Sequence, residues 1–143
     1  MGRILFYLLW PLVWLFALLT IRGRAVVVVG KEVLVVKNWF GSGAWQLPGG
    51  GLKHGEEAMV AINREIHEEL GYNLPAGRQL CDRPIFVQAQ GLVLRQYYGL
   101  YILPSKPAMT TNKEITEYKW VSLEEAPLPE QVRQAVQKLM GAS

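Results

Sequence analysis

The chain has 143 residues, which is enough for one globular domain and too few for two of ordinary size. Its single cysteine excludes an intrachain disulfide and a cysteine-based metal centre. The net charge is only +3 and no block of Lys or Arg is present, so specific nucleic-acid binding is not predicted; the mild excess could attract polyphosphate substrates. Half of the residues are hydrophobic, and the excess lies at the N-terminus.

Residues 4–21 form an apolar run of 18 residues without a charge. As one helix this run would be about 27 Å long, close to the roughly 30 Å of hydrocarbon in a bilayer. Arg3 precedes the run, and Arg22 and Arg24 follow it, so the charge difference favours a cytoplasmic C-terminal part. We therefore expect residues 1–23 to be a transmembrane helix that anchors the protein in a membrane by a single pass.

Three alternatives compete with the membrane anchor. A cleaved signal peptide lacks a small-residue cleavage site after the run. A pair of strands is disfavoured by Pro11 and by the leucine-rich composition. A helix that packs within a soluble, cytoplasmic protein, or that forms a homodimer, is the third alternative. The functional domain is expected at residues 24–143.

Downstream, the pattern changes to β-branched residues with a period of two. Residues 25–29 and 32–37 predict two strands joined by a turn at Gly30-Lys31. A loop with the aromatic residues Trp39 and Phe40 follows. It leads to three consecutive glycines at positions 49–51, where the backbone can approach a phosphate or a metal closely.

The stretch GGGLKHGEEAMVAINREIHEELGY at residues 49–72 predicts a glycine turn, a short loop and an acidic helix. Glu56 and Glu57 are expected in the first helical turn, where negative charge complements the helix dipole, and Gly71 is expected just past the last turn. An apolar stripe at helical spacing predicts the side that faces a core; it consists of Met59, Ile62, Ile66 and Leu70.

Three further carboxylates, Glu65, Glu68 and Glu69, fall within an arc of about 100° beside that stripe. They repel one another unless cations are present, and oxygen ligands without His or Cys suit a hard cation such as Mg²⁺ or Mn²⁺. The alternative is a solvated acidic face. Such a face usually carries Lys or Arg four residues further on, and Glu65 and Glu68 have neither there.

The rest of the chain predicts further strands and one helix. Residues 80–90 and 92–103 read as two long strands, and residues 114–121 as another. Residues 129–140 predict a terminal helix with Pro129 in its first turn. Strands on both sides of one helix, with a second helix, predict an α/β fold in layers.

The spacing of the glycine turn and the acidic helix resembles the signature of the Nudix hydrolases. The matching positions are Gly50, Glu56, Arg64, Glu65, Ile66, Glu68, Glu69 and Gly71; Tyr72 departs from it, since the family usually has an aliphatic residue there. Trp45 and Pro48 also resemble family sequence. The resemblance implies an α/β/α sandwich around a mixed β-sheet. It also implies Mg²⁺- or Mn²⁺-dependent hydrolysis, by water, of a phosphoanhydride bond in a nucleoside diphosphate linked to another group.

The resemblance also implies roles for individual residues. Glu68 and Glu69 would be the main metal ligands, Glu56 and the Gly50 carbonyl further ligands, Glu65 a ligand or the base, and Arg64 the residue that holds the carboxylates in place. A further acid is expected outside the motif, at Glu114 or Glu117. For substrate contact we expect Trp39, Phe40, Arg95 and Tyr97. The alternative function is a module that binds a nucleotide without cleaving it; loss of a motif acid would indicate it, and none is lost.

Overall fold

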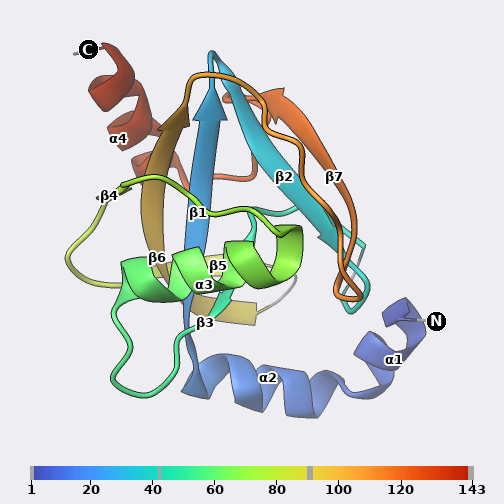
Figure 1. The fold of residues 1–143 in the computed structure, drawn as a ribbon. Coiled ribbons are helices and arrows are strands. Elements are labelled where there is room, and N and C mark those ends of the chain that lie inside the picture. Colours follow the sequence, from blue (N-terminus) through green and yellow to red (C-terminus); the bar gives the residue numbers. More distant parts are fainter. Residues whose placement is uncertain (1, 42, 90–91, 142–143) are drawn as a thin grey trace.

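The computed structural model describes residues 2–41, 43–89 and 92–141, and it has a twisted mixed sheet between two helices (Figure 1). Helix α3 (Ala58–Leu70) covers one face of the sheet, and helix α4 (Glu130–Gly141) packs on the opposite face. The α/β/α layering expected from the sequence is therefore present.

Over the residues that the structure describes, the sheet has seven strands. The strands are β1 (Ile21–Val29), β2 (Glu32–Asn38), β3 (Gly49–Gly51), β4 (Arg78–Gln79), β5 (Ile85–Ala89), β6 (Leu92–Leu103) and β7 (Ile115–Ser122). Their order is β4-β6-β1-β2-β7, with β3 paired to β1 and β5 to β6. Strands β1 and β6 are parallel, and the other pairs are antiparallel.

Strand β1 shows why the β-branched stretch lies at the centre of the sheet. Ala25 and Val27 belong to the core under α3, whereas Val26 and Val28 belong to the core under α4. All four are fully buried, because a strand covered by a helix on both faces has no solvent side. The two cores thus fix the position of the motif helix α3 relative to the sheet.

The N-terminal apolar run is not one helix. It forms α1 (Gly2–Leu8) and α2 (Trp10–Leu19), separated at Leu9, and its last residue, Ile21, begins β1. Pro11 lies in the first turn of α2, where its missing N–H is not needed. The longer helix has 10 residues, about 15 Å at 1.5 Å per residue, or half of a bilayer.

Among residues 2–41, 43–89 and 92–141, no helix is both long and apolar enough to cross a membrane. The predicted transmembrane helix is therefore wrong. The prediction treated Pro11 as tolerable inside one continuous helix, whereas here a new helix starts at that point.

Helices α1 and α2 lie below the ends of the strands (Figure 1), and their inner side packs against the start of β6 and the loop after β2. Phe6 is buried, and its ring meets those of Trp10 and Phe40 edge to face at centroid distances of 5.2 and 5.5 Å. Trp10 also packs against a small cluster of Leu92 and Leu94 on β6. The protein itself thus buries part of the surface that we had expected a bilayer to cover.

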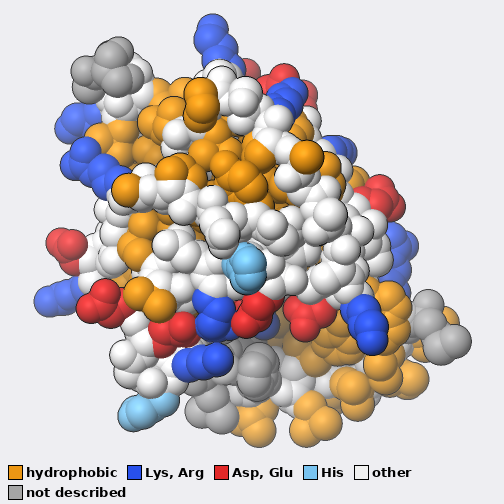
Figure 2. Space-filling view, viewed as in Figure 1, with side chains coloured by type: hydrophobic (Ala, Val, Ile, Leu, Met, Phe, Trp, Pro, Cys, Tyr) orange, Lys and Arg blue, Asp and Glu red, His pale blue; other side chains and the backbone are white. Residues whose placement is uncertain are grey.

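The outer side of the same helices remains exposed. Large hydrophobic side chains gather over α1 and α2 at the lower right of Figure 2. We call this surface the outer apolar face; it comprises Ile4, Tyr7, Leu8, Leu12, Trp14 and Leu15, of which Leu8 is the most exposed, at 73%.

The expected boundary between residues 23 and 24 lies inside β1. The residues before it, from Ile21 to Gly23, pair with β6, and Arg22 and Gly23 also pair with β3. A domain that starts at Arg24 would therefore lack part of the central strand.

Candidate active site

Helix α3 is placed by the residues at its two ends. It begins at Ala58 with Glu57 as its N-cap, so Glu56 and Glu57 precede the helix and do not lie in its first turn, as the sequence had suggested. It ends at Gly71, whose φ of 62° favours glycine and whose N–H donates to the His67 carbonyl at 3.0 Å. The C-terminal end therefore agrees with the prediction, and the N-terminal end lies two residues later.

The packing of α3 gives each acidic side chain a different environment. Ile62, Ile66 and Leu70 are fully buried under the sheet. Glu69, beside this stripe, is only 3% exposed, whereas the side chain of Glu68 is 54% exposed. The acids therefore extend from the core to solvent along one flank of the helix.

Arg64 joins the helix to the loop before it. Its guanidinium donates to both carboxylate oxygens of Glu56 at 3.0 and 2.9 Å, to Glu65 at 2.9 Å and to the Gly51 carbonyl at 3.1 Å. A weaker contact reaches Glu68 at 3.5 Å. The hydrogen bond from Arg64 lowers the pKa of Glu56 to about 2, and the Glu56 carboxylate raises the pKa of Arg64. The acidic face thus has its cation in Arg64, which precedes Glu65 and Glu68, and not four residues after them.

The glycine turn lies directly against a motif carboxylate. A Cβ atom at Gly50 would stand 2.5 Å from Cδ of Glu65, closer than any side chain tolerates. Glycine leaves room for the Glu65 carboxylate, which a larger residue at this position would displace. The backbone of β3 and Glu65 of α3 are thus close together.

Glu69 is the most unusual group of the cluster. One oxygen accepts a hydrogen bond from the Gly49 backbone, and Oε2 is buried without a partner among the residues that the structure describes. Burial, together with the negative charge of Glu65, raises the pKa of Glu69 to about 8. A buried carboxylate with an open oxygen is costly unless a cation or a proton accompanies it.

The donor set therefore fits a hard cation, although it is not arranged as a closed site. In the described part of the chain, no three His, Cys, Asp or Glu side chains converge as they would around a metal ion. The reason is visible in the contacts, since Arg64 occupies the carboxylates of Glu56 and Glu65. The open Glu69 oxygen, with Glu65 close by, is where an Mg²⁺ ion would find anionic oxygen ligands.

Two arginines that sequence reasoning had placed beside a membrane lie instead in β1, near these acids. Arg24 is 5% exposed and donates from Nη1 to the Leu47 carbonyl at 2.9 Å; Nε of Arg22 is buried with no partner in the described residues. Burial lowers the pKa of Arg24 to about 10 and also lowers that of Arg22, while Glu65 and Glu69 act in the opposite direction. In the sequence, the signal for this site was the spacing of Arg22 and Arg24, because residues two apart in a strand point to the same side of the sheet.

A cavity of about 660 Å³ adjoins this part of the sheet. Arg22 and Arg24 line it, as does Val13 of α2. An aromatic rim is formed by Trp39, Phe40 and Trp45, and the apolar wall by Val87, Leu92 and Leu94. The cavity thus combines cationic groups near the acids with a flat, apolar space beside them.

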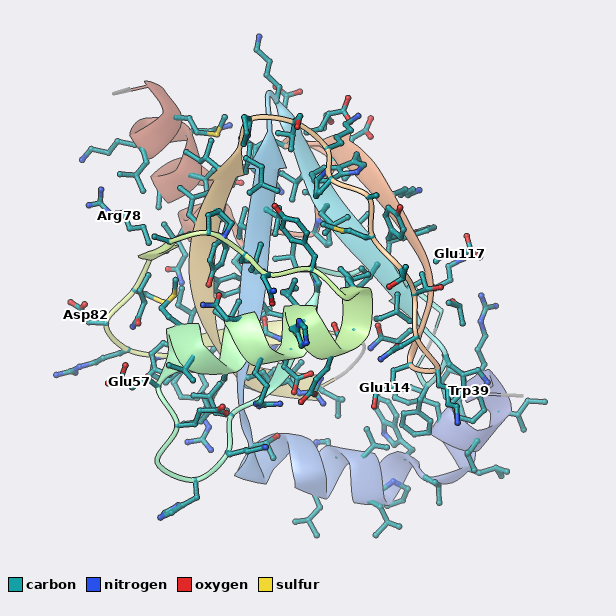
Figure 3. All side chains as sticks on the ribbon, in the orientation of Figure 1. Trp39, Glu57, Arg78, Asp82, Glu114 and Glu117 are labelled. Carbon is teal, nitrogen blue, oxygen red and sulfur yellow. The ribbon has the colours of Figure 1, made fainter. Side chains whose placement is uncertain are left out.

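The structure brings some of the expected outlying residues to this cavity. Trp39, Phe40 and Glu114 line it, and the Trp39 N–H donates to the Glu114 carbonyl at 2.7 Å (Figure 3). Glu114 is also close enough to raise the pKa of Glu69. Glu117 is exposed on β7 and points away in Figure 3.

The other expected contacts, Arg95 and Tyr97, alternate along β6 with Gln96 and Tyr98. Gln96 and Tyr98 are buried and line the cavity, and the other two are not among the described lining residues. Sequence reasoning chose the alternate positions because a single strand does not reveal which side is covered. The available signal was that Gln96 alternates with Leu94 and Tyr98, which puts these three residues on one face of the strand.

Comparisons with known proteins identify the family of this chain. A family model described as NUDIX domain matches residues 19–140. A putative 8-oxo-dGTP diphosphatase of Bacillus subtilis is 36% identical over 111 residues, which are 75% of this chain and 70% of that protein. The match to the family leaves α1 and most of α2 outside it.

Solved structures share the fold. A bifunctional NMN adenylyltransferase/ADP ribose pyrophosphatase from Francisella tularensis is 22% identical with a TM-score of 0.69, and the alignment covers 99% of this chain and 48% of that one. An Ap4A hydrolase from C. elegans is 19% identical with a TM-score of 0.66, and that alignment covers 87% of this chain and 100% of the other. The chain therefore belongs to the Nudix family, as its motif indicated, and is an enzyme of the pyrophosphohydrolase type.

Proposed function

We propose that this enzyme hydrolyses, with Mg²⁺, a phosphoanhydride bond in a nucleoside diphosphate linked to another group. The observation that carries the proposal is the buried Glu69 carboxylate, whose open oxygen lies beside Glu65. Names of related proteins, among them the putative 8-oxo-dGTP diphosphatase, support a nucleotide substrate.

The residues that would hold the ion are the acids of α3 and the glycine turn. We assign Glu69 and Glu68 as main ligands, with Glu56 and the Gly50 carbonyl as further candidates. When bound, the ion would offset phosphate charge and lower the pKa of a water molecule. Glu65 either binds the ion or accepts the proton of the attacking water, and Glu114 is the candidate for an additional acid.

The chain's other polar groups position the substrate. Arg64 holds Glu56, Glu65 and the Gly51 carbonyl in a fixed arrangement, so the acids keep their places when substrate enters. The guanidinium of Arg22, with its unpaired Nε, can donate to a phosphate oxygen. The aromatic rim of Trp39 and Phe40 offers a stacking surface for a nucleobase.

The test is hydrolysis of a substrate panel with Mg²⁺ and with a chelator. The panel contains 8-oxo-dGTP, ADP-ribose, a diadenosine polyphosphate, a nucleotide sugar and 5′-triphosphorylated RNA. We expect turnover of at least one compound, abolished by the chelator and restored by Mg²⁺. Nucleotide binding without turnover of any compound would favour a binding module and contradict the proposal.

A further inference from the structure

The floor of the cavity contains a buried polar pair that the proposed chemistry does not use. Gln96 is 5% exposed, and Tyr98 of the same strand is fully buried. The Tyr98 hydroxyl donates to Oε1 of Gln96 at 2.5 Å. A buried amide is costly unless its polar atoms find partners, so its place on a cavity wall calls for an explanation.

The position of Arg24 determines the direction of this hydrogen bond. An amide has the same shape in its two flipped orientations, so the surrounding network must decide between them. Arg24 is the register partner of Tyr98 on the neighbouring strand β1. Because a guanidinium group has only donors, the phenol oxygen beside it presents its lone pairs to Arg24 and donates its proton to Oε1 of Gln96.

This orientation leaves hydrogen-bond donors for a ligand. With Oε1 accepting from the Tyr98 hydroxyl, the NH₂ group of Gln96 supplies donors for a ligand. Gln96 is the register partner of Arg22 in the parallel β1–β6 pair, and Tyr98 is that of Arg24. The NH₂ group and two guanidinium groups therefore line neighbouring positions of the cavity. Side-chain acceptors among the lining residues are on Asn38, Gln46 and Glu114.

The NH₂ group of Gln96 can distinguish two classes of nucleobase. Hypoxanthine, guanine and uracil present a carbonyl oxygen where adenine and cytosine present an NH₂ group. A carbonyl can accept from Gln96, whereas an NH₂ group would leave donors facing each other, both without water and without a partner.

We propose that Gln96, oriented by Tyr98, makes this enzyme select substrates whose nucleobase carries a carbonyl group, in preference to amino-substituted bases. The inference rests on the proposed function, since it assumes that the nucleobase enters this cavity. Gln96 is the specificity-determining residue, and Tyr98 is a positioning residue that acts through it.

The decisive substrates differ only at the purine 6-position. We expect kcat/KM for ITP to exceed that for ATP by about ten- to a hundredfold, as an unpaired buried donor is costly. Binding of IMP and AMP, measured by calorimetry without metal, tests the same preference without hydrolysis, and IMP should bind more tightly. Equal binding of IMP and AMP together with equal turnover of ITP and ATP would overturn the inference and leave the proposed function intact.

Three variants separate selection from folding. Gln96→Glu replaces the donor with an acceptor, so the ITP/ATP ratio should fall below one. Tyr98→Phe releases the amide, so the ratio should approach one while turnover persists. Val93→Thr, at an exposed position of the same strand, is the matched control and should keep the parent ratio. A parent that binds IMP over AMP but hydrolyses nothing would contradict the proposed function alone. Unchanged ratios in both Gln96→Glu and Tyr98→Phe would overturn the inference.

Discussion

The sequence of the motif helix α3 predicts which of its faces is buried, whereas the sequences of the N-terminal helices α1 and α2 do not. In α3 apolar and charged residues segregate, so that Ile62 and Ile66 enter the core and the acids line one flank. In α2 every described side chain is apolar, whether it faces Leu92 and Leu94 or solvent. When apolar and charged residues segregate, the sequence determines which face of a helix is buried. A uniformly hydrophobic helix has no such preferred face. The sequence of α3 therefore predicts both its orientation and its function. The placement of α1 and α2 depended on the surfaces of β6 and of the loop after β2, against which they pack.

The largest effect should come from the buried acid of α3. Glu69→Gln keeps the shape of the side chain but removes an anionic ligand, so we expect hydrolysis to fall by about two to four orders of magnitude, at roughly 1.4 kcal/mol per tenfold. Without metal, the melting temperature should be unchanged or higher, because a buried carboxylate with an open oxygen is costly. The stabilisation by Mg²⁺ should shrink.

The matched control is Glu57→Gln, which changes an exposed acid at the N-cap of the same helix (Figure 3). It should keep parent activity and the parent response to Mg²⁺ in a melting experiment. Turnover of Glu69→Gln within a few-fold of the parent would remove Glu69 from the proposed metal ligands.

A smaller effect should follow from the residue that ties the loop to α3. Arg64→Lys keeps the charge but cannot reproduce the fork that contacts Glu56, Glu65 and Gly51, so we expect a roughly ten- to hundredfold lower kcat/KM. Arg78→Lys, at an exposed position on β4, serves as the control and should be neutral. Steady-state kinetics on the best panel substrate measures both; equal rates would show that Arg64 acts as a simple counter-charge.

The N-terminal pair is tested by shortening the chain. A protein starting at Thr20 keeps both cores and all of β1, so it should melt cooperatively. Loss of the buried Phe6 and of the contacts to Leu92 should lower the unfolding free energy by about 2–4 kcal/mol. The cavity also loses Val13, so KM should rise a few-fold.

A protein starting at Arg24 sharpens that test. It also lacks Arg22 and two further residues that pair with β6, so it should be less stable than the chain from Thr20. Chemical denaturation of the three lengths measures the difference. Equal stability of all three would mean that α1 and α2 contribute nothing to the domain.

The smallest effect on catalysis should come from the outer apolar face. Leu8→Ser with Leu12→Ser changes exposed positions, so activity and melting temperature should stay near those of the parent. Val13→Ser on the inner side is the matched control and should raise KM. The homodimer expected as an alternative from the sequence predicts that the parent self-associates in sedimentation experiments and that the double variant does so less. A parent that is monomeric at every concentration would show that dimer prediction to be wrong.

Local spacing was enough to predict the motif. The glycine turn, the apolar stripe and the left-handed Gly71 depend on contacts within about twenty residues, and helix geometry relates sequence position to direction over that distance. The hairpin turn at Gly30 and the alternation of β1 were predictable for the same reason. Fold class and the identity of the acidic cluster followed from these elements.

Tertiary structure alone decided the rest, because the relevant partners are far apart in the chain. From the sequence alone, Arg22 and Arg24 were interpreted as charges that flank a membrane helix. In the folded chain they are buried cations, because β1 pairs with β6 and lies near the acids of α3. The side of β6 that bears Gln96 was settled by which strands and helices cover it. The apolar run became two packed helices because Pro11 allows a new helix to start there and because Phe40 and Leu92 offer a surface to cover. Hydrophobicity specifies that such residues avoid water, and only the folded chain specifies what they pack against.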